Sequence, residues 1–471
     1  MTNKEERFGS IMASSYDFLL TTLAEHIGQH KKILVGFSGG LDSSVLLHLL
    51  VRLRTQAHQL SCERIALRAI HIHHGLNPKA DLWVEHCRQV CADWQIDFRT
   101  EKVELNTRRH GIEAAARNAR YHAFQHELQQ GEVLMTAQHL DDQAETFLLA
   151  LKRGSGPAGL SSMPSRMPFA GTTLIRPLLN ISRAELEAYA QTQKLPWVED
   201  DSNQDDRYDR NFLRLNIMPL LNQRWPHFPQ AVSRSASLCG EQEQLLDELL
   251  EESLHSLMTS EGAIAIPPLE NSSEAKRNAL LRRWLNQCGV KMPAREQLQR
   301  IWSEVALARQ DAEPRFRVGQ QDIRRYRQQL WLVPQYQNLA GSLLEWDLQQ
   351  ELTLPDRLGT LLCAKEKRIE NGVQNSIENS MTVRKPNRHE QVTVRFGVQG
   401  NISIVGRQHS RHSKKLWQEL GVAPWLRERI PLLYYNEQLI AALGVFITKE
   451  GQSLPDDEGI SVQWQRTTLH T

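Results

Sequence analysis

The sequence predicts an α/β protein whose N-terminal domain is built on a parallel sheet. In roughly the first half of the chain, short apolar runs alternate with helical patterns, which is typical of βαβ units. One apolar run leads straight into a helical pattern through a Ser-Gly-Gly turn at Ser38–Gly40. After about Trp225 the alternation ends and amphipathic patterns follow, so we expect further domains of a different kind.

The elements of the first domain, residues 1–225, follow from these patterns. Five apolar runs are predicted to be strands: Lys32–Phe37, Ile65–His74, Asp97–Leu105, Glu132–Gln138 and Thr173–Leu179. Five segments have helical patterns: Ser43–Arg54, Lys79–Trp94, Gly111–Gln129, Asp141–Lys152 and Ser182–Gln193. Ligands of parallel sheets bind at the carboxyl ends of strands, where the Ser-Gly-Gly turn is expected to lie.

Three further parts are expected after residue 225. Residues 226–340 are predicted to form a mainly helical domain followed by short β-like runs. Residues 341–390 are predicted to connect the domains, and the polar stretch Ala364–Asn387 is expected to be a linker or long loop. Residues 391–456 are predicted to form a small α+β domain.

The composition excludes several classes of protein. Of the 471 residues 40% are hydrophobic, which is enough for real cores, but no apolar run has the length of a membrane span. The first twenty residues contain no signal-peptide pattern, and six cysteines do not form a disulfide framework, so we expect a cytoplasmic protein. The net charge of +1 predicts that any nucleic-acid contact is made by local basic patches.

The junction "SGGLDSS" has the features of a phosphate site. A helix N-terminus leaves backbone N–H groups free and favours an anion, and Gly39 and Gly40 leave the main chain uncovered. Asp42 lies in the first turn, where a carboxylate can hold Mg²⁺. A capped tight turn is the alternative. The Walker pattern is absent, and the string instead resembles the pyrophosphate loop, or PP-loop, of the N-type ATP pyrophosphatases. This resemblance implies ATP binding by Ser38, Gly39, Gly40, Leu41, Asp42, Ser43 and Ser44.

Three other segments contain candidate site residues. His71, His73 and His74 end the second predicted strand and either line a nucleotide pocket or bind a metal. Asp141, Asp142 and Glu145 crowd the start of a helix; they are more than a cap requires, and a carboxylate cluster can hold an amine and accept its proton. Basic side chains that can meet phosphate, or else belong to solvated helix faces, are Arg117 and Arg210.

Taken in order, these motifs resemble those of the tRNA(Ile)-lysidine synthetases. The matching strings are "SGGLDSS", "HHGL", "GIEAAAR", "TAQHLDDQAET", "RGSGPAGL" and "EDDSNQDDRYDRNFLR", and the tail from Ile404 to Phe446 resembles the C-terminal domain of the longer, proteobacterial form. The resemblance implies a ligase that uses ATP to adenylate the C2 oxygen of the wobble cytidine in a tRNA(Ile) with a CAU anticodon. The amine of L-lysine then displaces AMP. The product reads AUA instead of AUG and accepts isoleucine instead of methionine.

The resemblance also implies roles for single residues. Asp42 would ligate Mg²⁺, and Arg117 or Arg210 would contact the α-phosphate or the adenylated base. Lysine would be bound and deprotonated by the acids of the cluster: Asp141, Asp142 and Glu145.

Contact with tRNA is expected from basic residues in the later domains. The densest cluster contains Arg407, Arg411, Lys414 and Lys415. The basic and aromatic strings Arg282–Trp284 and Arg324–Trp331 are either RNA contacts or ordinary helix faces. A homodimer is left open. Three rival functions are considered. A tRNA thiolase would need catalytic cysteines or an iron–sulfur cluster, and a synthetase that takes ammonia from glutamine would need an amidotransferase domain. The third rival is a non-catalytic RNA-binding protein.

Overall fold

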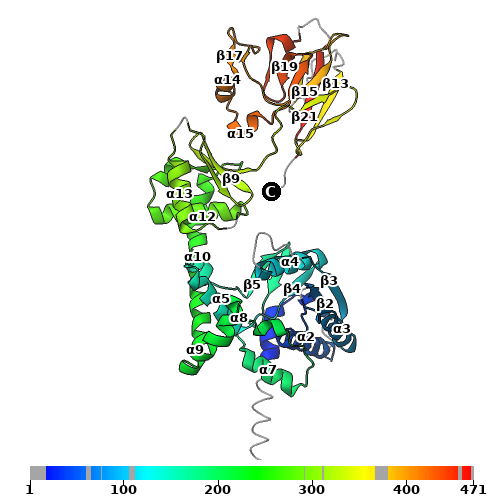
Figure 1. Ribbon diagram of the computed structural model, residues 1–471, viewed down its shortest axis with the longest axis vertical. Coiled ribbons are helices and arrows are strands. Elements are labelled where there is room, and N and C mark those ends of the chain that lie inside the picture. The colour runs from blue at the N-terminus through cyan, green and yellow to red at the C-terminus, as the bar shows by residue number, and fades with distance from the viewer. Residues whose placement is uncertain are drawn as a thin grey trace, which may run out of the picture. The chain divides into compact units, whose positions relative to one another are not determined.

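The computed structural model describes residues 17–59, 65–75, 77–104, 112–290, 292–309, 312–365, 380–453 and 459–467. The chain forms two compact units, residues 1–249 and 250–471 (Figure 1). No helix in the described part of the chain combines the length and the apolar character that crossing a bilayer requires.

The N-terminal unit contains the predicted parallel sheet. Its strands are β1 (Lys32–Gly36), β2 (Ala66–His73), β3 (Asp97–Lys102), β4 (Glu132–Met135), β5 (Arg166–Phe169) and β6 (Thr172–Ile175). They lie in the order β3-β2-β1-β4-β6-β5, and all neighbours are parallel except β5 and β6. The edge strand β5 was not predicted, because it contains a proline and is largely exposed, so it lacks an apolar pattern.

Helices cover both faces of this sheet. They are α2 (Leu41–Gln59), α3 (Ala80–Asp93), α4 (Ile112–Glu127), α5 (Leu140–Lys152), α6 (Pro157–Leu160), α7 (Arg183–Thr192), α8 (Asp209–Phe212) and α9 (Met218–Arg224), with short turns η1 (Asp201–Gln204) and η2 (Leu213–Ile217). Residues 17–27 are also helical.

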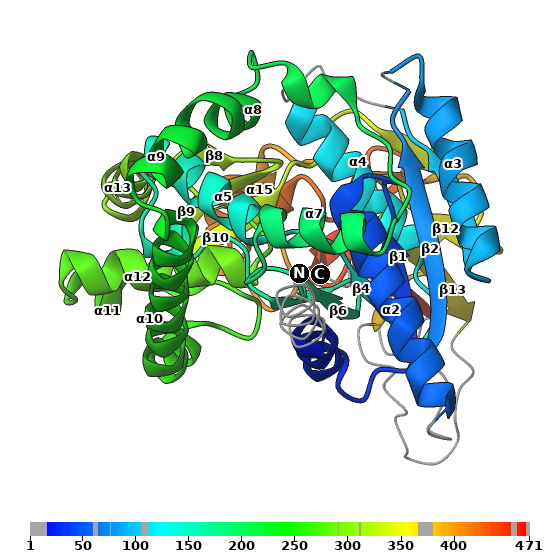
Figure 2. The same ribbon diagram turned by 90° about the horizontal axis from the view of Figure 1, so that it is seen from below.

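The alternation of strand side chains divides the core between these faces. Ile33 and Val35 of β1 pack in one cluster with α2, α3 and α7, whereas Leu34 packs on the opposite face with Phe124 of α4. Figure 2 shows α2 and α7 side by side. Because the chain runs outward from β1 to β3 and then returns to β4, the strand order reverses between β1 and β4, where doubly wound sheets bind their ligands.

The C-terminal unit begins with a module in which helices are followed by short strands. Its elements are α10 (Phe228–Leu257, continuing from the first unit), β7 (Ile264–Ala265), α11 (Ile266–Glu270), α12 (Glu274–Gln287), α13 (Arg295–Arg300), η3 (Ile301–Ala306), β8 (Arg315–Val318), β9 (Gln321–Tyr326) and β10 (Gln329–Pro334). The helices share a core with a four-stranded sheet ordered β7-β10-β9-β8, and Trp284 is fully buried in it.

The rest of this unit is a β-rich module with two sheets. Its strands are β11 (Leu343–Glu345), β12 (Leu352–Thr353), β13 (Thr360–Lys365), β14 (Ser380–Arg384), β15 (Val392–Arg395), β16 (Asn401–Ile402), β17 (Arg411–His412), β18 (Leu432–Tyr435), β19 (Gln438–Ala442), β20 (Phe446–Ile447) and β21 (Gly459–Gln465). Its helices are α14 (Ser413–Glu419), α15 (Pro424–Arg427) and η4 (Lys449–Gly451).

This module differs from the predicted division of the chain. The range 341–390, expected to connect domains, contains β11, which pairs with β15, and β13 and β14, which both pair with β21. The polar stretch 364–387 therefore joins two strands of one sheet instead of two domains; its residues 366–379 lie outside the described part. These strands are short and mostly half-buried, so their sequences give only a weak periodic signal.

Candidate active site

The predicted phosphate loop joins β1 to α2 at the carboxyl end of the sheet. Gly39 has φ +82°, and a Cβ atom there would lie 2.7 Å from Sγ of Cys87, so the position requires glycine. Gly40 is different: its added Cβ would meet nothing closer than 3.5 Å. Gly40 is therefore not required by packing, and it leaves the main chain open at the start of α2.

Hydrogen bonds within the loop fix its shape. Oγ of Ser43 donates to the Gly40 carbonyl at 3.0 Å, and it lies 3.0 Å from Oγ of Ser38. Oγ of Ser44 reaches the Gly39 carbonyl at 3.4 Å and is fully buried. Leu41 is a core residue, so only its main chain can contribute to a phosphate site. Two of the predicted hydroxyl donors thus hold the loop itself.

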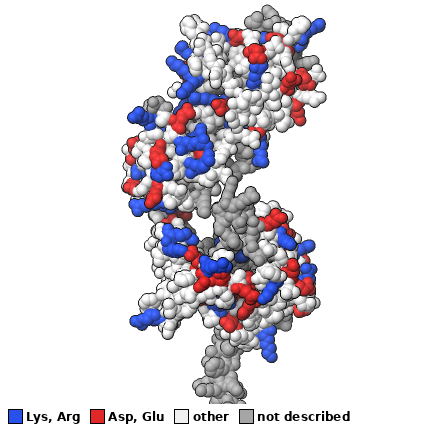
Figure 3. Space-filling view, in the orientation of Figure 1, with Lys and Arg blue, Asp and Glu red and all other residues white. Residues whose placement is uncertain are grey.

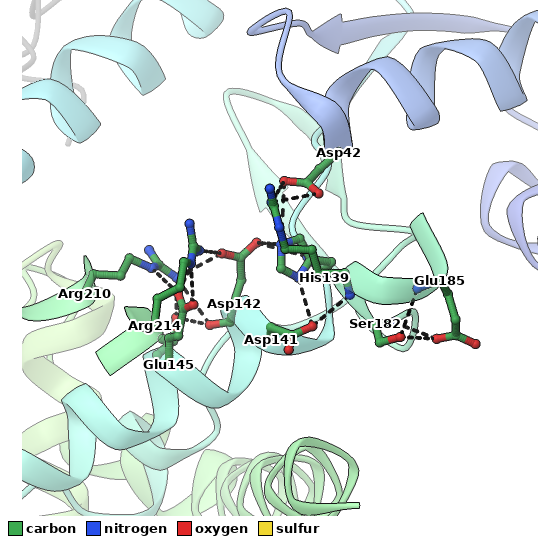
Figure 4. A network of polar contacts seen from close by, with 11 residues as sticks. Asp42, His139, Asp141, Asp142, Glu145, Ser182, Glu185, Arg210 and Arg214 are labelled. Carbon is green, nitrogen blue, oxygen red and sulfur yellow. Dashed lines mark hydrogen bonds and ion pairs between the residues drawn. The ribbon is translucent and has the colours of Figure 1, made fainter. Parts of the chain in front are cut away.

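Four acids and a histidine from neighbouring strand ends form one polar network with three arginines (Figure 4). His139 follows β4 and is 1% exposed, and its Nε2 lies 3.6 Å from Oδ2 of Asp42 and 3.4 Å from Oδ2 of Asp142. Its Nδ1 lies 3.6 Å from Oδ2 of Asp141. The carboxylate of Asp42 also meets Nη1 of Arg183 at 3.3 Å. His139 therefore links the acid of the phosphate loop to those at the start of α5.

The innermost acid of this network is matched by two guanidinium groups. Glu145 is 1% exposed, and it accepts from Nε of Arg210 at 2.9 Å and from Nε of Arg214 at 2.7 Å. Nη2 of Arg214 also donates to Oδ1 of Asp142 at 3.0 Å. The two arginines lie on α8 and η2, one turn apart, so the segment after residue 205 closes one side of the site.

The network shifts the pKa values of its members in opposite directions. Burial acts to lower the pKa of His139, but the carboxylates of Asp142, Asp141 and Asp42 outweigh it and raise the pKa. Burial acts to raise the pKa of Asp141, but His139 and the backbone N–H of Arg183 bring it below its usual value. Burial dominates at Asp42, whose pKa is raised. The site therefore favours an ionised Asp141 beside a positively charged imidazole.

The three predicted histidines of β2 and its end are not gathered around a metal. His71 is buried, with Nδ1 3.1 Å from the Phe37 carbonyl, and His73 has Nε2 3.2 Å from Asp81. In the part of the chain that the structure describes, no three His, Cys, Asp or Glu side chains are grouped to hold a metal ion. A Mg²⁺ ion held by Asp42 would therefore take its other ligands from phosphate oxygens, as Mg²⁺ ions at nucleotide sites commonly do.

Cys87 and Cys91 of this unit are placed for packing. Sγ of Cys87 lies beneath the phosphate loop, 3.4 Å from Nδ1 of His71, and both Cys87 and Cys91 are fully buried. Burial raises the pKa of Cys91 to about 12, so its thiol is a poor nucleophile. These two residues do not have the character that a thiolase requires.

The structure brings most of the predicted site residues together. Asp42, Asp141, Asp142, Glu145 and Arg210 lie in one cluster. Arg117 contacts the ring of Tyr121 on its own helix. Arg183 was missed. His139 and Arg214 stand beside the predicted acids and beside Arg210 in the sequence, but no catalytic role was predicted for them.

The predicted basic cluster lies on the β-rich module. Arg407 forms an ion pair with Glu419, and Nε of Arg411 lies 3.9 Å from the same carboxylate. Lys414 and Lys415 are exposed on α14. Elsewhere in the view of Figure 3, basic and acidic side chains are interspersed. Four cations around one acid leave this part of the module with a local positive excess.

The strings Arg282–Trp284 and Arg324–Trp331, left open between RNA contact and ordinary helix faces, use their aromatic rings for packing. Trp284 is buried, and its Nε1 donates to the Gly262 carbonyl at 2.9 Å. Tyr326 and Trp331 pack against Trp425 of the β-rich module, with ring centroids 5.9 and 6.0 Å apart. These rings hold the two modules of the C-terminal unit together.

Comparison with known proteins agrees with this arrangement. A family model described as PP-loop domain matches residues 12–221, one described as TilS substrate binding domain matches 265–331, and one described as TilS substrate C-terminal domain matches 392–464. The tRNA(Ile)-lysidine synthase of Photorhabdus laumondii is 66% identical over 458 residues, which cover 97% of this chain and 100% of the relative.

The chain belongs to the tRNA(Ile)-lysidine synthase family. The family member from Proteus mirabilis is 55% identical and covers 95% of this chain and 98% of its own length. Among solved structures, the U34-tRNA thiolase NcsA of Methanococcus maripaludis has 18% identity and a TM-score of 0.40, covering 48% of this chain and 80% of the thiolase. The family and the enzyme class predicted from the sequence, an ATP-dependent ligase, are thereby confirmed, as is the fold class.

Proposed function

We propose that this chain ligates L-lysine to C2 of the wobble cytidine in a tRNA(Ile) with a CAU anticodon. The observation that carries the proposal is the network centred on His139, which joins the phosphate loop after β1 to the acids after β4. The proposed triphosphate and amine sites both lie at the point where the strand order of the sheet reverses, which supports the proposal.

In the first step, the uncovered amides at the start of α2 hold the β- and γ-phosphates of ATP. Asp42 would hold Mg²⁺, which neutralises negative charge on the phosphates. The C2 oxygen of the cytidine attacks the α-phosphorus, the bond to the β-phosphate oxygen breaks, and pyrophosphate leaves. Arg117, from the helix on the other face of the sheet, is proposed to contact the α-phosphate.

In the second step, the lysine amine attacks C2 and AMP leaves with the former C2 oxygen. The protonated amine must first lose a proton, which is proposed to pass to a carboxylate of the acid cluster. Asp141 is proposed to bind the ammonium group, because it is 24% exposed and its contacts with His139 and with the N–H of Arg183 both use Oδ2. A carboxylate with a lowered pKa favours holding a cation over accepting its proton.

Glu145 and Arg210 are proposed to act together with Arg214. Because both guanidinium groups pair with the buried Glu145, that acid serves to position them and leaves lysine to the more exposed acids. Arg210 then presents a fixed positive charge to the phosphate of the adenylated intermediate. Because its ion pair with Glu145 already holds the Arg210 guanidinium in place, this side chain needs little rearrangement during the reaction.

Binding of the tRNA is proposed to use the basic cluster Arg407, Arg411, Lys414 and Lys415. A cytoplasmic location is also proposed, since the described cysteines are all free thiols, as in reducing compartments. The proposal needs residues of one chain alone, so it holds for a single copy and for a homodimer.

Incubation with ATP, labelled lysine and a CAU-anticodon tRNA(Ile) transcript tests the proposal. Label should enter the tRNA, with release of one pyrophosphate and one AMP for each lysine. A transcript with uridine at the wobble position is the matched control and should stay unlabelled. Label in both transcripts, or in neither, would contradict the proposal.

The role of Asp141 has a test of its own. Asp141→Asn should raise the KM for lysine at least tenfold, while pyrophosphate release on the tRNA at saturating ATP falls less than threefold, as expected from loss of one charge-assisted contact to the amine of ~1.5–3 kcal/mol. An equal loss in both measurements would show that Asp141 does not discriminate between the steps.

A further inference from the structure

One buried arginine of the N-terminal unit is absent from the network above. Arg176 follows β6 and is 2% exposed, and its Nη1 donates to the Pro164 carbonyl at 2.8 Å. Its Nη2 lies 3.5 Å from the hydroxyl of Tyr121. The second of these contacts connects Arg176 to α4, the helix that carries Arg117.

Tyr121 is held firmly from two other sides. Its ring meets Phe124 edge-on, with centroids 6.0 Å apart and an interplanar angle of 73°. It meets Phe169, the last residue of β5, in the same way at 5.7 Å and 72°. Edge-to-face packing of this kind fixes the plane of a ring. These two contacts hold the ring of Tyr121 between Phe124 of its own helix and Phe169 of the edge strand β5.

The guanidinium of Arg117 lies over the ring of Tyr121. Its Cζ lies 5.0 Å from the ring centroid of Tyr121, within the range of a cation–π contact. The two residues are four apart on α4, so they lie on one side of the helix. Arg117 itself is exposed, and an exposed arginine without a partner would sample many rotamers.

We propose that Tyr121 is a positioning residue, whose anchored ring holds the guanidinium of Arg117 in place for adenylation. The inference rests on the proposed role of Arg117 at the α-phosphate. A flexible cation would lose conformational freedom on meeting the phosphate, and a cation already fixed over a ring avoids part of that loss. The effect should fall on the rate of adenylation and leave tRNA affinity unchanged.

A double-mutant cycle measures this coupling. Pyrophosphate release is followed at saturating ATP, lysine and CAU-anticodon tRNA(Ile) for the wild type, Arg117→Ala, Tyr121→Leu and the double variant. Tyr121→Leu should lower kcat about three- to fivefold, with each KM within about twofold of the wild type. In the Arg117→Ala background the same change should have no further effect.

Two matched variants separate positioning from packing. Tyr121→Phe keeps the ring and should retain kcat within about twofold. Phe169→Leu removes one of the two contacts that anchor the ring but keeps the cation–π pair, so it should lower kcat less than Tyr121→Leu does; a circular-dichroism melt confirms that each variant is folded.

The outcomes against the inference are distinct. A three- to fivefold loss from Tyr121→Leu that recurs in the Arg117→Ala background, or an equal loss in Tyr121→Phe, would overturn the role of the ring. Wild-type kcat in Arg117→Ala would instead refute the role proposed for Arg117, and the inference would fall with it.

Discussion

Substitution by alanine should affect stability at one glycine of the phosphate loop and ATP binding at the other. Gly39→Ala puts a Cβ at φ +82°, 2.7 Å from Sγ of Cys87 and 3.2 Å from Cγ2 of Val198. A left-handed backbone costs a residue with a Cβ about 1–2 kcal/mol, and overpacking of a buried site adds about 1–3 kcal/mol. We therefore expect Gly39→Ala to lower the free energy of unfolding by about 2–5 kcal/mol.

Gly40→Ala is the matched control for stability. Its Cβ would lie 3.5 Å from Oγ of Ser38 and 3.8 Å from the Val198 carbonyl, which are ordinary contacts, so we expect a loss below about 1 kcal/mol. The added methyl group would nevertheless cover main chain that is proposed to meet phosphate. Gly40→Ala should thus keep the fold and raise the KM for ATP at least tenfold.

Urea-dependent hydrogen exchange suits this comparison, because peptides from β1 and α2 report on the N-terminal unit alone. The KM for ATP comes from pyrophosphate release. Equal stability of Gly39→Ala and the wild type would refute the packing argument. A wild-type KM in Gly40→Ala would show that the open main chain of the loop is not the phosphate site.

Three other predictions follow from burial and charge. Glu145→Gln leaves the charges of Arg210 and Arg214 without their buried partner and should lower the free energy of urea unfolding by about 3 kcal/mol. The control Glu187→Gln, on the exposed face of α7, should lower it by less than about 0.5 kcal/mol. Equal losses in the two variants would contradict the pairing. Burial lowers the pKa of the His71 imidazole to about 4 in the folded protein, whereas in the unfolded chain it is about 6.5. As the pH falls below about 6.5, the unfolded chain is protonated at His71 and the folded protein is not, so acid lowers the stability of the fold. His71 should contribute about 2 kcal/mol to the loss between pH 7 and pH 5, and His71→Asn, which cannot titrate, should show a correspondingly smaller loss; an unchanged pH dependence would exclude this source. A variant that neutralises the whole basic cluster should bind tRNA more weakly, with a reduced salt dependence in filter binding; the cluster is Arg407, Arg411, Lys414 and Lys415. Neutralising the exposed Arg88 and Arg300 should change neither quantity. Identical behaviour of the two variants would show that the cluster does not contact tRNA.

Local sequence determined the elements that surround the site. The apolar runs at β1 and β4 and the Ser-Gly-Gly turn after β1 are patterns of adjacent residues, so the strands, the loop and the acids at the start of α5 could be placed from the sequence. The short strands β11 and β14 could not be placed, because they are held by partners far along the chain, β15 and β21.

Tertiary structure alone decided which charges meet. Arg183 and His139 are 44 residues apart, and each reaches Asp42 only because β1, β4 and α7 converge at one edge of the sheet. The pairing of Glu145 with Arg210 and Arg214 likewise depends on how the segment after residue 205 packs against α5. The sequence by itself therefore determined the residue types at the site, whereas long-range packing decided which acid is neutralised by arginine and which stays exposed to a substrate.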